Sequence, residues 1–473
     1  MKTKVLYRIQ KIGCKPYRVI VYRLLTGVFC WLALLSCERL LEVDPPSTLT
    51  ATDQVFSDDA TAETAVRGMY ADMVSNHVFS GNQNSVLALA GLSSDELFHP
   101  PGTNIEAVQF QENILQADNQ LILSLWDDIY RSVYSANVLT ERLEASTGLT
   151  TDAREEFIGE ALFVRAFCHF YLVNLFGEVP LVTTTDYQAN AVISRTGITE
   201  VYEQVVEDLL IAIEFLDPAY PDDERVRPNR GAAMALLARV YLYLGNWTEA
   251  EKWTTEVIND SNYRLVELNS ITLSNNEEAI WQLHSSSPTV NAATQEGNSF
   301  NVPSSFNALR EEMVEAFEPG DLRKMEWIRL DASSFYAPFK YKVTGSGTDR
   351  SEYSTILRLA EQYLIRAEAR TQQNKLIEAI ADLDSIRGRA GLPLLAEIDP
   401  EIGQSELLDV IIHERRVELF SEWGHRWLDL KRTGQADTVL SLLKSEFTSE
   451  DKLYPIPQQE LNNNPNLRQN VGY

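Results

Sequence analysis

The chain has 473 residues and a formal net charge of −27, with 41 basic side chains against 68 acidic ones. This acidic balance argues against nucleic-acid binding, which requires clustered basic residues, and against electrostatic adhesion to anionic lipid. A chain of this length can bury a large core without help from disulfides.

The first 36 residues are typical of a bacterial secretion signal. They carry seven basic side chains and no acidic one, and they end in an apolar run from Leu24 to Leu35. That run makes only about 18 Å of helix, too short for a membrane core of about 30 Å. We expect residues 1–36 to be a signal peptide that is removed, which leaves a net charge of −34 because seven basic residues are lost.

The residues Leu34-Leu35-Ser36-Cys37 look like a lipobox, whose cysteine is acylated and becomes the new N-terminus. The alternative is an ordinary secretory signal with a chance cysteine. Two or more acyl chains hold a protein firmly to a membrane. Of the four cysteines only Cys37 and Cys168 would survive cleavage, so no internal disulfide is expected, and Cys168 should be a small buried residue of an apolar helix.

Residues 37–58 read as an extended, lipid-anchored tether that contains Pro45-Pro46. The first helix should follow directly, with Asp58 or Asp59 as its cap and an apolar side that includes Tyr70. Helical spacing of apolar residues predicts three further long helices. We expect them over residues 120–143, over residues 155–176 with an end at Gly177, and after Thr199.

Two later segments resemble each other at a distance of 129 residues, LLARVYLYLGNWTEAEKWTTEVI and IRAEARTQQNKLIEAIADLDSIR. Each has small alanines that let two antiparallel helices approach closely, with a turn at Gly245-Asn246 or at Asn374-Lys375. The first looks like a tetratricopeptide unit. The sequence therefore predicts a mostly α fold, in which tetratricopeptide-like helix pairs form a scaffold with few short strands, in a single domain over residues 59–473.

Long polar insertions interrupt this scaffold near residues 80–119 and 265–348. The second contains one strand-like apolar stretch, AIWQLH. Loops of such length in a compact protein are usually functional or disordered. We therefore expect a binding surface to be built from these two insertions.

The segment from His413 to Gly434, HERRVELFSEWGHRWLDLKRTG, combines one apolar helical stripe with a dense mixture of Arg and Glu. This pattern predicts a buried helix whose charged side chains pair inside the molecule. Gly424 interrupts the run and is expected either to bend the helix or to admit a neighbouring backbone. Five tryptophans on helical stripes are assigned to the core: Trp126, Trp247, Trp253, Trp423 and Trp427.

This segment closely resembles the corresponding helix of the SusD/RagB family of outer-membrane lipoproteins. So do CERLLEVDPPSTLTATDQVFSDD after the lipobox, the stretch RLAEQYLIRAEA, and the ending LYPIPQQELNNNPNLRQNVGY, in which Val471 stands where the family usually has proline. The resemblance implies a lipid-anchored protein of the outer membrane that faces outward. It also implies a nutrient ligand and a SusC-like TonB-dependent barrel as partner.

The sequence contains no recognisable catalytic constellation. His413-Glu414 lacks the second histidine of an H-E-x-x-H metal motif, and no nucleophile elbow, P-loop or C-x-x-C pair occurs. We therefore predict a protein that is not an enzyme and has no cofactor or metal. A surface hydrolase would need a catalytic set that is not visible.

Glycan binding needs aromatic side chains beside groups that hydrogen-bond hydroxyls, and both insertions supply them. The candidate ligand-binding residues are Phe98, His99, Asn104, Asn298, Phe300, Phe335 and Tyr336. The leading hypothesis is capture of an oligosaccharide or polysaccharide for delivery to the barrel. A peptide-capturing member of the same family and a protein-interaction repeat protein without ligand remain as alternatives. No nucleic-acid partner is expected.

Overall fold

The computed structural model describes residues 55–75, 77–100, 104–284, 293–300, 307–331, 333–345 and 348–473. Residues from Phe56 onward form one compact unit. The predicted signal peptide, Cys37 and nearly all of the predicted tether lie outside the described residues.

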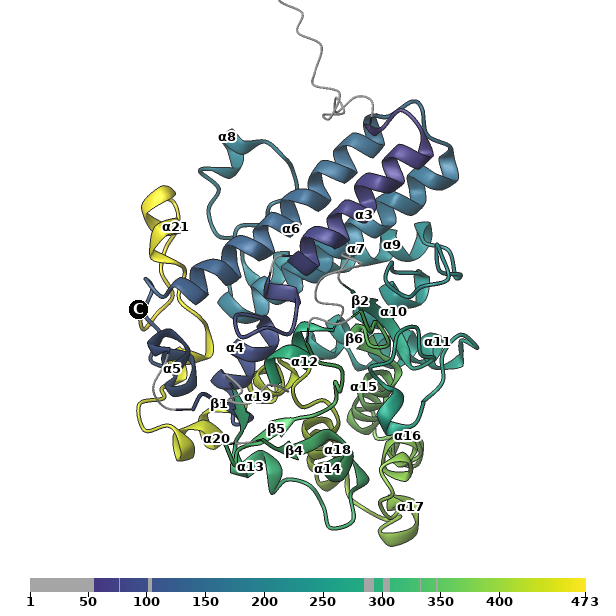
Figure 1. The fold of residues 1–473 in the computed structure, drawn as a ribbon, viewed down its shortest axis with the longest axis vertical. Coiled ribbons are helices and arrows are strands. Elements are labelled where there is room, and N and C mark those ends of the chain that lie inside the picture. Colours follow the sequence, from purple (N-terminus) through teal and green to yellow (C-terminus); the bar gives the residue numbers. More distant parts are fainter. Residues whose placement is uncertain are drawn as a thin grey trace, which may run out of the picture. The chain divides into compact units, whose positions relative to one another are not determined.

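Long helices packed in sequence order form the scaffold, as predicted (Figure 1). They are α3 (Asp59–Ser75), α6 (Gln120–Ala145), α7 (Thr151–Phe176), α9 (Ile198–Phe215), α10 (Arg230–Tyr243), α11 (Trp247–Asn259), α15 (Leu359–Gln372), α16 (Leu376–Arg389) and α18 (Gln404–Glu418). Each of α6, α7, α9, α10, α11, α15 and α16 packs against the next in this order. The four helices α3, α6, α7 and α9 lie together at the top of Figure 1.

Shorter elements complete the described part of the chain. The short helices are α4 (Val86–Ser93), α5 (Ile105–Glu112), α8 (Tyr187–Asn190), α12 (Gln295–Phe300), α13 (Glu311–Val314), α14 (Leu322–Trp327), α17 (Leu395–Ile398), α19 (His425–Arg432), α20 (Ala436–Leu443), α21 (Gln458–Asn463) and the 3-10 turns η1 (His77–Phe79), η2 (Leu268–Ser270) and η3 (Ser449–Lys452). The strands are β1 (Leu97–Phe98), β2 (Ala279–Leu283), β3 (Ala308–Leu309), β4 (Ile328–Leu330), β5 (Tyr336–Pro338) and β6 (Ser354–Arg358). They pair antiparallel as β1–β3, β2–β6 and β4–β5.

Side-chain caps explain where the long helices α3, α6 and α7 begin. Asp58 Oδ1 accepts from Thr61 N at 2.9 Å, which confirms the predicted first cap. The Asn119 side chain accepts from the first turn of α6 and Thr150 from that of α7. Gly177, at a φ of 76°, ends α7 as predicted.

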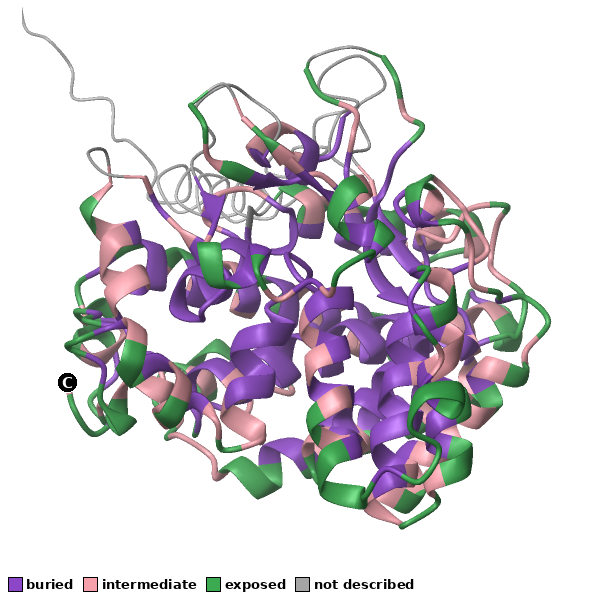
Figure 2. Cartoon of the chain, turned by 90° about the horizontal axis from the view of Figure 1, so that it is seen from below, coloured by how far each residue is buried: buried purple, intermediate pink, exposed green. Residues whose placement is uncertain are grey.

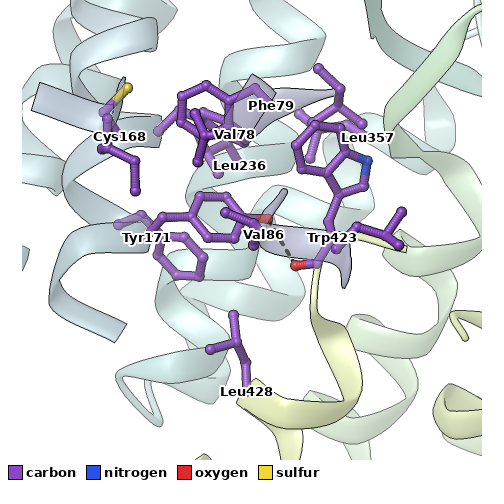
Figure 3. Packing of buried hydrophobic residues seen from close by; sticks show 14 of the residues in the cluster. Val78, Phe79, Val86, Cys168, Tyr171, Leu236, Leu357, Trp423 and Leu428 are labelled. Carbon is purple, nitrogen blue, oxygen red and sulfur yellow. Dashed lines mark hydrogen bonds between the residues drawn. The ribbon is translucent and has the colours of Figure 1, made fainter. Parts of the chain in front are cut away.

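Helix α7 is long and apolar enough to cross a membrane by length and composition. However, 94% of its apolar window is buried inside the protein, so it is the central core helix. Figure 3 shows its Tyr171 and Cys168 packed among residues of distant segments, and Tyr171 Oη donates to Trp423 O at 3.2 Å. Cys168 is buried, as predicted.

The helix predicted over residues 413–434 is instead two helices, α18 and α19. Between them Ser421, Trp423 and Gly424 have φ values of 51°, 47° and 74°, in the left-handed region that an α-helix cannot contain. A Cβ on Gly424 would lie 2.7 Å from Ala90 Cβ, so this glycine does admit a neighbouring segment. The periodic stripe alone did not reveal the break.

The charges of this segment pair inside the molecule, as predicted. Arg323 Nη1 lies 2.6 Å from Glu414 Oε1 and 2.9 Å from Glu418 Oε2. Arg358 lies 2.9 Å from Glu278, 2.6 Å from Glu418 and 2.8 Å from Glu422. Burial opposes ionisation of Glu418, but the surrounding arginines outweigh it and hold its pKa far below the ordinary value.

Buried residues fill the interior of the described unit, and exposed ones cover its loops and outer helix faces (Figure 2). Trp126, Trp423 and Trp427 are at most 4% exposed, which confirms their assignment to the core. Trp247 and Trp253 are only partly buried, but each packs against a cluster of buried core residues. Trp253 Nε1 donates to Glu249 at 3.1 Å, so the indole uses its polar edge near the surface.

The two predicted insertions are more structured than expected. All residues of α4 are buried, because the apolar sequence VLALAGLS packs on every side. The second insertion contains β2, α12, α13, α14 and the β4–β5 hairpin. The strand predicted from AIWQLH is β2, which is wholly buried.

Candidate ligand-binding surface

Strand β1 carries Phe98 and is attached to the core by the two acidic residues before it. Asp95 lies 2.7 Å from Arg426 and 2.9 Å from Arg416. Glu96 accepts a hydrogen bond from Ser421 N at 2.8 Å. Burial disfavours the charge on Asp95, but the bond to Arg426 and both arginine charges outweigh it and lower its pKa. This anchoring fixes the start of β1 relative to the break between α18 and α19.

The β4–β5 hairpin carries Phe335 and Tyr336. Leu330 and Tyr336 form its last pair, and the turn is closed by Asp331. Asp331 N donates to Phe335 O at 2.8 Å, and Phe335 N donates to Asp331 Oδ1 at the same distance. The two hydrogen bonds hold the aromatic residues in one backbone conformation.

The structure brings Phe98 and Phe335 together, although 237 positions separate them in sequence. Their ring centroids are 5.3 Å apart and their planes are nearly perpendicular, at 77°. Such edge-to-face pairs are favourable beyond the area that they bury. Both rings are half-buried, so each keeps some exposed area.

Tyr336 and Leu330 are the exposed part of the hairpin, at 44% and 57%. Residues directly opposite each other in an antiparallel pair lie on the same face, so the two side chains lie side by side. Together with Phe98 and Phe335 they make up what we call the hairpin surface. Leu330 was not among the predicted residues, although the stretch WIRLDASSFYAP shows the apolar spacing of a hairpin around a polar turn.

The predicted polar residues have structural partners of their own. Asn104 is the N-cap of α5, and its Oδ1 accepts from Glu106 N at 3.0 Å and from Ala107 N at 3.3 Å. His99 is 5% exposed, and its Nδ1 lies 3.2 Å from Asn307 Oδ1. Asn298 Oδ1 accepts from Gly345 N at 2.8 Å. The structure thus explains these three residues by local hydrogen bonding.

Phe300 is part of the hydrophobic core and is only 4% exposed. The expectation that its ring forms a platform does not fit this burial, because a platform must offer a free face. The sequence around Phe300 gave no sign of this burial, because the six-residue helix α12 is too short to show an apolar stripe. Of the seven candidates, Phe98, Phe335 and Tyr336 are therefore retained.

The described residues contain no group of three or more His, Cys, Asp or Glu side chains that could hold a metal ion. Burial lowers the pKa of His169 to about 3 and that of His425 to about 4. Both imidazoles are therefore neutral at neutral pH. Their position inside the core explains them as packed side chains.

The described residues form a helical scaffold with a few short strands, and aromatic side chains lie on or next to these strands. One family model, described as starch-binding and associating with the outer membrane, matches residues 21–242. A second model, that of the SusD family, matches residues 323–473. The chain belongs to the SusD family.

Individual relatives match over most of the chain. The SusD-like protein P25 of Formosa agariphila is 25% identical over 97% of this chain and 100% of its own length. The starch-binding protein SusD of Bacteroides thetaiotaomicron is 33% identical over 25% of this chain and 21% of that protein. The structure of a laminarin-binding SusD-like protein has a TM-score of 0.76 and 26% identity, and covers 88% of this chain and 100% of that one.

Proposed function

We propose that the protein is a surface lipoprotein that captures a glycan on the hairpin surface and delivers it to a SusC-like TonB-dependent barrel. The observation that carries the glycan part is the edge-to-face pair of Phe98 and Phe335, together with the exposed Tyr336, the next residue of the hairpin. The family description and the laminarin-binding relative support the same ligand class. Acylation of Cys37, outside the described residues, would attach the protein to the outer membrane.

The physical basis is the match between a sugar ring and an aromatic side chain. A pyranose presents an apolar C–H face, which gains contact and loses water against Tyr336 and Leu330. Hydroxyls at the ring edge then remain free for polar neighbours and solvent. Since Asp331 already holds the hairpin in place, little conformational entropy is lost on binding.

The binding test is calorimetry of the lipid-free protein against a panel of polysaccharides, including starch and laminarin, and of peptides. Tyr336→Ala should weaken glycan binding by at least about 1 kcal/mol, because interface energy concentrates in a few large side chains. Tyr134→Ala, at an exposed tyrosine of α6, is the matched control and should bind like the wild type. Circular dichroism should show both variants folded.

Each outcome decides between the candidate functions. Glycan binding with wild-type affinity and stoichiometry after substitution of Phe98, Phe335 and Tyr336 would remove the hairpin surface from the proposal. Binding to peptides alone would assign the protein to peptide capture. For the delivery step, crosslinking in intact cells should join the lipoprotein to a TonB-dependent barrel; failure to do so would leave capture without delivery.

A further inference from the structure

A cavity of about 440 Å³ lies between α6, residues 180–193 and the C-terminal segment that contains α21. This volume falls within the range of about 300–1,000 Å³ that is usual for small-molecule sites. The cavity shares no residue with the hairpin surface. It is lined by Trp126, Asp127, Tyr130, Arg131, Pro180, Val182, Asn190, Ala191, Ile193, Glu460, Asn463, Asn464 and Leu467.

Two aromatic side chains of α6 form the apolar part of this cavity. Trp126 is only 3% exposed, and the Tyr130 ring lies against it with centroids 4.8 Å apart. Tyr130 Oη donates to Pro180 O at 2.8 Å, which holds the tyrosine ring in one position. Val182 and Leu467 contribute further apolar surface. The helical stripe of α6 had assigned Trp126 to the core alone.

The opposite wall is held in place by hydrogen bonds between two distant segments. Asn464 Nδ2 donates to Ile193 O at 2.8 Å, and Asn466 Nδ2 donates to Val192 O at 2.6 Å. Both asparagines belong to the stretch LNNNPNLRQN near the C-terminus. The cavity is therefore formed before any ligand arrives, which lowers the entropic cost of binding.

Two carboxylates line the cavity without a cationic partner. Among the described residues Asp127 has no hydrogen bond or ion pair, and Glu460 receives only a long contact of 3.4 Å from Asn463 Nδ2. The nearby Arg131 is paired with Asp128 at 3.0 Å. Burial and then the charge of Glu460 raise the pKa of Asp127. The charge of Arg131, which also lines the cavity, opposes this rise. With two carboxylates and one arginine in its lining, the cavity offers acceptor oxygens and has a net negative charge.

We propose that this cavity is a second carbohydrate site, which takes a sugar unit that carries no negative charge. The ring of the sugar would pack on Tyr130, and its hydroxyls would donate to Asp127 and Glu460, with the Asn463 amide at the rim. Uronate or sulfated units are excluded by the two carboxylates. The ligand class rests on the proposed function, whereas the location does not.

A second site changes how a long polymer is held. A polysaccharide that engages both sites binds the second one intramolecularly, so its overall affinity exceeds that of either site. A short oligosaccharide should occupy each site independently, because the two sites share no residue. Chain length of the ligand therefore separates the two contributions.

Ala191 provides a variant that fills the cavity without removing a contact. It is exposed, lines the cavity and has an ordinary helical φ of −65°, so a large side chain is tolerated by the backbone. Ala191→Trp should reduce the calorimetric stoichiometry for short neutral oligosaccharides of starch and laminarin from two to one. Affinity for the polymer should fall at least about tenfold. Ala191→Ser is the matched control and should bind like the wild type.

Tyr336→Ala should weaken the other binding event and leave the cavity site occupied with unchanged affinity. A single event in the wild type that is weakened by Tyr336→Ala and unchanged by Ala191→Trp would overturn the second site and leave the proposed function intact. No binding of any glycan would instead overturn the proposed function. As a test of charge, Asp127→Asn combined with Glu460→Gln should weaken neutral binding and permit oligouronate binding; unchanged discrimination would contradict the assigned role of the carboxylates.

Discussion

Replacement of Glu96 by Gln should stabilise the protein at neutral and alkaline pH and leave its stability in acid nearly unchanged. The Glu96 side chain is 4% exposed and lies directly before β1, facing Lys340, Asp95 and Arg426. Burial raises its pKa from 4.5 to about 7, against the opposing effects of the Ser421 N–H and the Lys340 charge. A glutamine can still accept the hydrogen bond from Ser421.

The size of the effect follows from this pKa. A rise from 4.5 to about 7 corresponds to about 3 kcal/mol, at about 1.4 kcal/mol for each pKa unit. Between these two values the folded state of Glu96 binds more protons than the unfolded state. The stability of the wild type therefore falls as the pH rises through this window, and the whole loss is present above pH 7. The glutamine variant avoids it.

The assay is urea unfolding of both proteins over a series of pH values from about 4.5 to 8.5, with the free energy of unfolding extrapolated to water. The difference in the free energy of unfolding between Glu96→Gln and the wild type should grow between pH 4.5 and about pH 7 and level off above pH 7. Asp95→Asn is a control with the opposite sign, because ion pairs lower the pKa of Asp95 and it stabilises the fold above its ordinary pKa. A difference between Glu96→Gln and wild type that is independent of pH would refute the reasoning.

Further predictions concern the core, the anchor, the hairpin surface and turnover. Trp427→Ala should cost about 3–5 kcal/mol of stability by denaturant unfolding, because Trp427 is 0% exposed and stacks on Tyr454; wild-type melting would contradict this. Cys37→Ala should lose labelling by a palmitate analogue and leave the membrane fraction, whereas an unlabelled but membrane-bound variant would reject the lipoprotein. Phe98→Ala should weaken glycan binding with a nearly unchanged melting temperature, and a stability loss without an affinity change would make the ring structural. Release of reducing sugar from any glycan of the panel would contradict the prediction that the protein is not an enzyme.

Local sequence signals were sufficient for the scaffold. Helices α6, α7 and α9 follow from apolar spacing. The starts of α6 and α7 also coincide with the polar caps Asn119 and Thr150. These signals act within a few residues of the chain, so they can be read without knowledge of the fold. The break after α18 escaped detection, because the left-handed Trp423 lies among contacts with distant segments. Its indole Nε1, for example, donates to Thr355 O at 2.7 Å.

Only part of the candidate site could be predicted from local sequence signals. Aromatic residues in polar insertions were identifiable, but their exposure was not, because burial depends on what packs above them. Phe300 and Tyr336 look alike in sequence, yet one is 4% exposed and the other 44%. A polar side chain in an insertion can either contact a ligand or hydrogen-bond its own backbone, and the sequence does not distinguish the two. Asn104 was predicted to contact a ligand, but it caps α5.

The sequence by itself determined the family, the helical scaffold, the acidic charge and the pairing of the charges of residues 413–434 inside the molecule. These depend on composition and on spacing along one chain. Only the tertiary structure decided which side chains meet. Phe98 and Phe335 come together because β1 and the hairpin are placed by separate anchors, and the α6 cavity exists because the C-terminal segment is bound to residues 192 and 193. Contacts between residues hundreds of positions apart are set by the packing of the whole core, and no local pattern encodes them.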